Sequence, residues 1–181
     1  MNHDINRTVG LNLPLDRFEI KKTIGVLPDG RAISWMGVDR KGNKVILRHY
    51  PPSAHNAAEK WLDRNWTGWA RILEVKKGGG VCLVIREWIN GRSFSKLMEN
   101  RQDLPEEKLS RNIFHNLCMN LEPLSQQGEA HGALKPANLF IDENIIITDP
   151  LLTRDVISDV ESTLASLVPG HPAYLTPEQL K

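Results

Sequence analysis

The sequence predicts an α+β protein in which a small antiparallel sheet of five strands, with one helix, precedes a mainly helical part. Two observations predict this class. Three segments with strand-like alternation lie between residues 17 and 50 and are joined by short turns. A run with apolar residues three or four positions apart follows at 104–127. We therefore expect an N-terminal arm at 1–16, a sheet part at 17–89 and a reduced, helical part at 90–181.

The sheet part is expected to contain one helix between its third and fourth strands. The five strands are expected at residues 17–25, 32–39, 44–50, 70–75 and 81–88. Turns at 28–30 and 40–43 contain Gly30 and Gly42, and a glycine-rich loop separates the last two strands. Pro51 and Pro52 end the third strand, so we expect Ser53 to cap a helix over 54–64.

The second part is expected to be built around the long helix at 104–127. Asp103 is a capping residue, Pro105 suits the first turn, and Gly128 ends the helix, while Pro123 predicts a kink in its last turn. The apolar stripe of this helix consists of Leu109, Ile113, Leu117, Leu121 and Leu124. Shorter elements are expected as a helix at 93–100, strands at 138–142 and 145–149, and a helical turn at 158–167.

Composition sets limits on the function. The net charge of +1 gives no general case for binding nucleic acid or a membrane surface. The two cysteines, Cys82 and Cys118, lie in apolar runs, and we expect both to be buried free thiols in a reducing compartment. The sequence has no signal-peptide pattern and no zinc-ligand spacing, so a cytoplasmic protein is expected.

Several motifs, in order, resemble those of the protein kinase family over residues 17–180. "HGALKPANLF" at 131–140 is similar to the catalytic loop H-R-D-L-K-P-x-N, and "ITDPLLTR" at 147–154 to the metal-binding segment that begins D-F-G. "GHPAYLTPEQL" at 170–180 is similar to the end of an activation segment, with Pro177 and Glu178 in matching places. The resemblance implies a two-lobed kinase-like fold.

The catalytic loop departs from the family pattern at two positions. Gly132 replaces the arginine that binds a phosphorylated activation segment, and Ala133 replaces the aspartate that accepts the substrate proton. Loss of a general base alone costs about 10²–10⁴-fold in rate. Pro150 and Leu151 also replace the phenylalanine and glycine after Asp149. The resemblance therefore implies a pseudokinase, a kinase-shaped scaffold or regulator without phosphotransferase activity.

The resemblance also assigns a residual nucleotide site. In the first part, Gly25 and Gly30 flank Leu27 in the glycine-rich loop, Arg48 takes the place of the phosphate-binding lysine, and Glu59 is its expected partner. Arg86 occupies the gatekeeper position, from which it can reach Asp149 or Glu59 or extend to solvent.

In the second part the resemblance assigns Lys135, Asn138 and Asp149 to this site. Asn138 and Asp149 are metal ligands only if nucleotide binds. We expect Ile46 and Phe140 to fill the adenine space, so that no cofactor is needed. The alternative is a divergent nucleotide-binding protein or atypical phosphotransferase that uses Mg-ATP through Lys135, Asn138 and Asp149.

The long helix is the expected interaction surface. The sequence ends shortly after Glu178, where the family continues with a helix that covers this region, so the apolar stripe is expected to lie uncovered. We expect a protein partner or self-association at Leu109, Ile113, Leu117 and Leu121. The five tryptophans are expected to pack in the core, with a partner-binding aromatic patch as the alternative.

Overall fold

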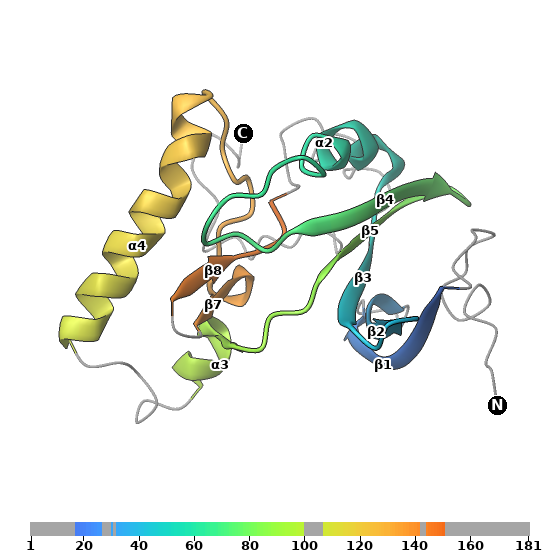
Figure 1. Ribbon diagram of the computed structural model, residues 1–181, viewed down its shortest axis with the longest axis horizontal. Helices are drawn as coiled ribbons and strands as arrows, with labels where there is room; N and C mark the ends of the chain where they lie inside the picture. Colours follow the sequence, from blue (N-terminus) through green and yellow to red (C-terminus); the bar gives the residue numbers. More distant parts are fainter. Residues whose placement is uncertain (1–16, 27–29, 31, 100–106, 142–143, 151–181) are drawn as a thin grey trace. The chain divides into compact units, whose positions relative to one another are not determined.

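The computed structural model describes residues 17–26, 30, 32–99, 107–141 and 144–150 (Figure 1). The described chain forms two compact units. The first contains the described residues up to Arg64 together with Arg71–Trp88, and the second contains Asn65–Ala70 together with the described residues from Ile89 to Pro150. The short segment Asn65–Ala70 is therefore part of the second unit, although the sequence on both sides of it belongs to the first.

The first unit is a five-stranded antiparallel sheet, as the sequence predicts. Its strands are β1 (Phe18–Val26), β2 (Ala32–Asp39), β3 (Lys44–Tyr50), β4 (Ile72–Gly78) and β5 (Val81–Glu87). They lie in the order β1-β2-β3-β5-β4, and each neighbouring pair is antiparallel. The meander of three strands is local in sequence because few residues separate β1 from β2 and β2 from β3.

One face of this sheet carries a hydrophobic core cluster of the first unit. The core cluster consists of Phe18, Trp35, Val45, Leu47, Leu83 and Ile85. Trp35 lies opposite Leu47 in the register of β2 and β3, and the period of two along β3 places His49 on the same face. His49 packs edge-on against Trp35, with ring centroids 4.7 Å apart. Trp35 is thus a core residue, as expected.

The turn between β2 and β3 is organised by Asp39. Its carboxylate accepts hydrogen bonds from the backbone N–H groups of Lys41 and Asn43, both at 2.8 Å, and from the side chain of Asn43. Gly42 takes the left-handed conformation, with φ of 84°, that the turn requires. The hydrogen bonds from Asn43 are the main reason why the pKa of Asp39 is lowered.

The helix expected at 54–64 is shorter and less regular than predicted. A 3-10 turn η1 (Pro52–Ala54) leads into α2 (His55–Glu59), which is followed by i→i+3 hydrogen bonds such as Trp61 N to Ala58 O at 3.0 Å. Ser53 lies inside η1, and neither element has a side-chain cap, so the predicted Ser53 cap is wrong. The consecutive prolines favour a 3-10 start, because their fixed φ and missing N–H groups suit it.

The second unit contains a long helix and a three-stranded sheet. Its elements are β6 (Arg92–Ser93), α3 (Phe94–Met98), α4 (Glu107–Gln126), η3 (Pro136–Asn138), β7 (Leu139–Ile141) and β8 (Ile145–Ile147). The sheet order is β6-β7-β8. The helices and strands β7 and β8 were expected, whereas β6 and η3 were not, because two- and three-residue elements leave no periodic pattern.

The long helix α4 continues through Pro123 and ends at Gln126. Gly128 has φ of 68°, and the N–H of Glu129 donates to the carbonyl of Leu124 at 2.9 Å. This left-handed glycine with a six-to-one hydrogen bond is a Schellman motif, so the predicted stop at Gly128 is confirmed.

Several expected features lie outside the described residues. They are the arm at 1–16, Leu27, Asp103, Pro105, the turn at 158–167 and the activation-segment motif at 170–180. The side chain of Leu109 is also outside the described part.

The cysteines and the apolar stripe need correction. Cys82 is buried, as expected, and burial raises the pKa of its thiol to about 12, whereas Cys118 on α4 is exposed. Of the predicted stripe, Ile113, Leu117 and Leu121 are half-buried within the second unit rather than uncovered.

Among the described helices, none is long and apolar enough to cross a membrane.

Candidate functional site

The loop 131–138 in the second unit holds the candidate site, and hydrogen bonds to its own backbone fix its shape. The carbonyl of Ala133 accepts a hydrogen bond from Asn138 Nδ2 at 2.8 Å, and the N–H of Ala133 donates to His131 Nδ1 at 3.1 Å. Asn138 is 2% exposed and Ala133 is 6% exposed. The loop is therefore held at residue 133 through backbone atoms alone.

His131 connects this loop to the strand β8 and the residue before Asp149. Its Nε2 lies 3.0 Å from the carbonyl of Thr148. Because Nδ1 accepts from a backbone N–H, the proton is on Nε2, which donates to this carbonyl. Burial lowers the pKa of His131 to about 4, so the ring is neutral at physiological pH.

Trp69, from the segment Asn65–Ala70, packs on the other side of this loop. Its ring stacks on His131, with centroids 5.7 Å apart, and its Nε1 donates to the carbonyl of Asn120 at 2.7 Å. The segment pairs with β8 through two backbone hydrogen bonds of 2.8 Å, Ala70 N to Ile147 O and Ile147 N to Gly68 O. The loop thus rests against a fixed aromatic ring.

Asn138 and Thr148 join the loop to Asp149. The N–H of Thr148 donates to the carbonyl of Asn138 at 2.9 Å, and the Thr148 hydroxyl lies 3.4 Å from Asp149 Oδ2. Asp149 has φ of 56°, a conformation that Asp tolerates better than most residues and that often marks functional sites. Both Asp149 and Lys135 act electrostatically on His131, Asp149 raising its pKa and Lys135 lowering it.

The second unit therefore brings together all the residues that the sequence assigned to it. Lys135, Asn138 and Asp149 lie around His131, with Gly132 and Ala133 in the same loop. Gly132 is in the left-handed conformation, with φ of 76°. The described residues contain no group of three or more His, Cys, Asp or Glu side chains that could hold a metal ion. The residues that the resemblance names as possible ligands for a cation are Asn138 and Asp149.

The candidate residues of the first unit have different surroundings. The guanidinium of Arg48, on β3, lies 5.4 Å from the centroid of the Tyr50 ring. Glu59, at the end of α2, has its Oε2 3.4 Å from Nδ1 of His55, and its side chain is 53% exposed. The contact with His55 lies within the helix, and the partnership of Glu59 with Arg48 stays a prediction.

Arg86 and the glycines complete the residues assigned to the first unit. Arg86 is 7% exposed and donates through Nη1 to the carbonyl of Glu87 at 3.0 Å, so it does not extend into solvent. Gly25 lies in β1 at a register shift, where an added Cβ would lie 3.1 Å from Ser34 Cβ. Gly30 has φ of 83° and open space around it. Leu27, between these glycines, lies outside the described residues.

Sequence reasoning missed Trp69, Asn120 and Thr148 as supports of the loop. The signal for Trp69 was its place among closely spaced tryptophans, which predicted core packing without naming the loop. Thr148 is fully buried, and Asn120 donates through Nδ2 to the carbonyl of Ile145 at 3.1 Å. Their roles depend on contacts between segments far apart in sequence, which periodicity does not reveal.

Comparisons with known proteins find similar sequences among protein kinases. The chain is 32% identical over 104 residues to a protein described as serine/threonine-protein kinases drp72 of Corynebacterium efficiens, covering 56% of this chain and 20% of that protein. It is 29% identical over 141 residues to serine/threonine-protein kinase Nek2 of Mus musculus, covering 74% of this chain and 29% of that protein. It is 27% identical over 177 residues to ribosomal protein S6 kinase beta of Caenorhabditis elegans, covering 90% of this chain and 29% of that protein.

The fold is protein kinase-like. The relatives named above are Ser/Thr protein kinases, and the five-stranded antiparallel sheet is the kinase-like first part that the sequence predicts. No protein-family model matches the chain. The kinase-like chain spans between 20% and 29% of the length of these three relatives.

Proposed function

We propose that this chain is a catalytically inactive, kinase-like module that acts as a scaffold or regulator through protein interactions. The observation that supports this most strongly is Ala133. Phosphoryl transfer to a hydroxyl needs a carboxylate that orients the hydroxyl and accepts its proton. A methyl side chain offers no oxygen for either task.

The geometry of the loop explains why this loss is compatible with folding. Residue 133 is held by its own carbonyl and N–H, through Asn138 and His131, and its side chain takes no part in those bonds. An aspartate at this position would therefore serve chemistry rather than loop shape. The absence of this aspartate removes the general base and leaves the folded loop intact. This combination is expected of an interaction module.

Arg48 supports the same proposal. A lysine presents a compact ammonium to nucleotide phosphates, whereas arginine carries a planar fork that stacks on aromatic rings. The Arg48 guanidinium lies over the Tyr50 ring, and Glu59 pairs with His55. The first unit therefore has an arginine, with its guanidinium over Tyr50, in place of the lysine that the kinase family uses to place the phosphates.

The alternative is a divergent nucleotide-binding protein or atypical phosphotransferase. It is favoured by the way Lys135, Asn138 and Asp149 remain together around His131, with Asp149 in its left-handed conformation. In this reading Asn138 and Asp149 hold a metal ion and Lys135 contacts a phosphate. The alternative keeps nucleotide binding without the usual base.

Thermal denaturation with ATP and either Mg²⁺ or Mn²⁺ separates the two readings. A ligand present at 100 times its Kd stabilises the folded state by about 2.7 kcal/mol, which is a readily measured shift in Tm. The proposal predicts no metal-dependent shift at millimolar ATP. A shift that requires the metal and is lost in the Asp149→Asn variant would support the alternative instead.

A further inference from the structure

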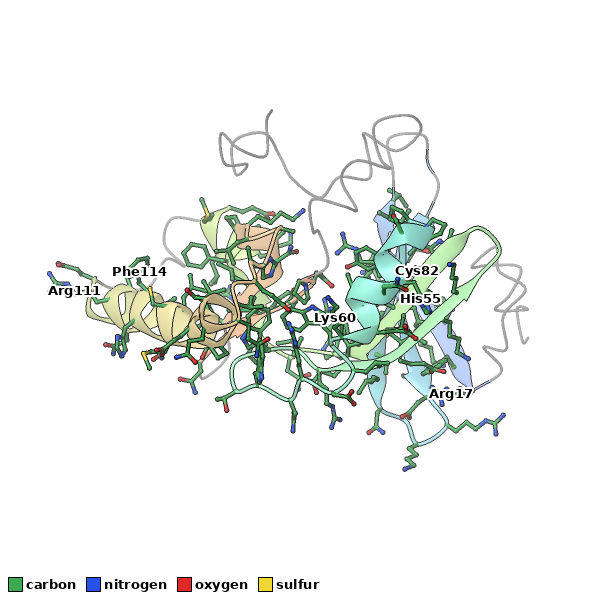
Figure 2. All side chains as sticks on the ribbon, turned by 90° about the horizontal axis from the view of Figure 1, so that it is seen from above. Arg17, His55, Lys60, Cys82, Arg111 and Phe114 are labelled. Atoms are coloured by element: carbon green, nitrogen blue, oxygen red, sulfur yellow. The ribbon has the colours of Figure 1, made fainter. Side chains whose placement is uncertain are left out.

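The helix α4 has an outer face that its own unit leaves exposed. The side that faces the unit contains Leu124, which is buried, and Asn120, which bonds to the carbonyl of Ile145. About 100° or more around the helix from that side lie Arg111, Phe114, Cys118 and Glu122, which we call the outer face. Figure 2 labels two of them, Arg111 and Phe114, on α4. These four residues are three or four positions apart, so they share one side of the helix.

The outer face combines an apolar centre with charged ends. Phe114 is 67% exposed and Cys118 is also exposed. Arg111 pairs with Glu107 at 2.6 Å, and both of these side chains are about 80% exposed, which leaves them open to a further partner. Glu122 is exposed and accepts a hydrogen bond from Gln126 at 3.1 Å. A cation therefore lies before the apolar pair, and an anion lies after it.

This order of charges makes the outer face complementary to itself. When two copies of a helix pack antiparallel around a two-fold axis, residue i of one copy lies opposite residue j of the other, and the reverse also holds. With the axis near residue 116, Phe114 lies opposite Cys118 of the second copy. The same register places Arg111 beside Glu122 of the second copy, and this favourable pair occurs twice. A parallel arrangement instead brings Arg111 beside Arg111 and Glu122 beside Glu122.

We propose that the outer face of α4 binds the outer face of α4 in a second copy of this chain, in an antiparallel pair. The idea deepens the proposed interaction module by naming one partner, a second copy. It also corrects the predicted surface, because the residues that face outward are Phe114 and Cys118 rather than Ile113 and Leu117. Phe114 is the apolar anchor, and the Arg111–Glu122 pairs fix the register.

The size of the surface sets the expected strength. A helix of 20 residues is about 30 Å long, so a contact between two such helices lies at the low end of specific protein interfaces. We therefore expect a reversible dimer with a Kd in the range of about 10–100 μM, a range typical of weak and transient associations.

Charge reversal tests the register directly. We expect Arg111→Glu and Glu122→Arg, each alone, to abolish dimerisation in sedimentation equilibrium at 200 μM protein, because each places like charges in contact. An equimolar mixture of the two single variants recovers the dimer, since every cross-pair is then opposite in charge. The double variant also recovers it. Residues 111 and 122 are too far apart within one helix to pair with each other, so recovery reports contact between copies.

The two cysteines provide a second test in the unchanged protein. Cys118 is exposed, whereas Cys82 is buried with a pKa of about 12, so a short bis-maleimide reacts at Cys118. We expect a cross-linked dimer that disappears in Cys118→Ser and persists in Cys82→Ser. Far-ultraviolet circular dichroism of every variant checks that α4 remains folded.

The proposal is wrong if the unchanged chain sediments as a monomer at 200 μM, or if it dimerises and both charge-reversed variants still dimerise. A dimer that forms in each charge-reversed variant alone, but not in their equimolar mixture, would equally contradict the proposal. These outcomes are independent of nucleotide binding, so self-association and the absence of phosphoryl transfer can fail separately.

Discussion

At the scale of single residues, the buried His131 and the half-buried His49 link stability to pH. Burial lowers the pKa of both His49 and His131 to about 4, from an ordinary value near 6.5. His131 has hydrogen-bond partners at both ring nitrogens, whereas the buried Nε2 of His49 has no partner among the described residues. Both rings are therefore neutral in the folded chain.

The direction of the pH effect follows from these values. Below pH 6.5 the unfolded chain takes up protons at these histidines while the folded chain does not, so their contribution to stability is complete above pH 6.5 and falls toward pH 4. Each of the two histidines adds up to about 1.4 kcal/mol per pH unit to the slope of the unfolding free energy against pH. We predict that the free energy of unfolding, measured in urea, decreases as the pH falls from 6.5 to 4.

His49→Phe gives a matched control for this slope. Phenylalanine keeps the edge-on packing against Trp35 and removes the buried nitrogen, so we expect little loss of stability at pH 7. The slope between pH 6.5 and 4 becomes shallower in this variant. An unchanged slope, measured by urea titration at several pH values, would show that His49 is not protonated on unfolding in this interval.

At the scale of elements, two glycines with left-handed backbone make a matched pair. Gly68, in the segment beside β8, and Gly128, after α4, have φ of 77° and 68°. An added Cβ at Gly128 meets no atom within 4 Å, whereas at Gly68 it overlaps the side-chain amide of Asn120. The difference between the two positions is therefore the contact with α4.

We predict that Gly128→Ala destabilises the fold by about 1–2 kcal/mol, which is the cost of a left-handed alanine. Gly68→Ala is expected to cost about 1–3 kcal/mol more, because Asn120 must move away from the carbonyl of Ile145 and leave a buried polar group unpaired. Chemical denaturation of both variants measures the difference. Equal losses of unfolding free energy in the two variants would mean that the packing of Gly68 on Asn120 contributes nothing to stability.

Elements with a strong periodic pattern were predictable from the sequence. The alternation in β1, β2 and β3 and the helical spacing in α4 identified these elements, and Gly128 marked the end of α4. The helix after Pro52 was predicted too long, because propensity alone does not reveal a switch from α-helical to 3-10 hydrogen bonds. The face of α4 that is exposed depends on contacts with β8, which the stripe of leucines did not specify.

Sequence analysis could name only those residues of the candidate site that lie within kinase-like motifs. His131, Lys135, Asn138 and Asp149 were named from the order of kinase-like motifs, and the second unit brings them together. The support from Trp69 was not predictable, because this residue belongs to a segment about sixty positions earlier in the sequence. Glu59 was assigned to Arg48 by analogy with the kinase family, and its contact with His55 is a local one between residues four positions apart in α2.

At the scale of the whole molecule, a kinase-like fold keeps the structure of the loop 131–138 without the catalytic aspartate. The five-stranded sheet, the loop 131–138 and the left-handed Asp149 are all present, while Ala133 leaves no proton acceptor in the loop position. Since typical protein kinases turn over at about 1–100 s⁻¹, loss of the base alone leaves roughly 10⁻⁴–1 s⁻¹. The proposal expects Arg48 to add a further loss, which takes the rate below this range.

The most direct test of the proposed inactivity is transfer of labelled phosphate from γ-labelled ATP, in Mg²⁺ or Mn²⁺, to the chain itself and to a general basic protein substrate. The proposal predicts no incorporation above that of the Asp149→Asn variant, at a detection limit of about 10⁻⁴ s⁻¹, the lower end of what base loss alone leaves. Metal-dependent incorporation that exceeds this control would contradict it and establish an atypical phosphotransferase.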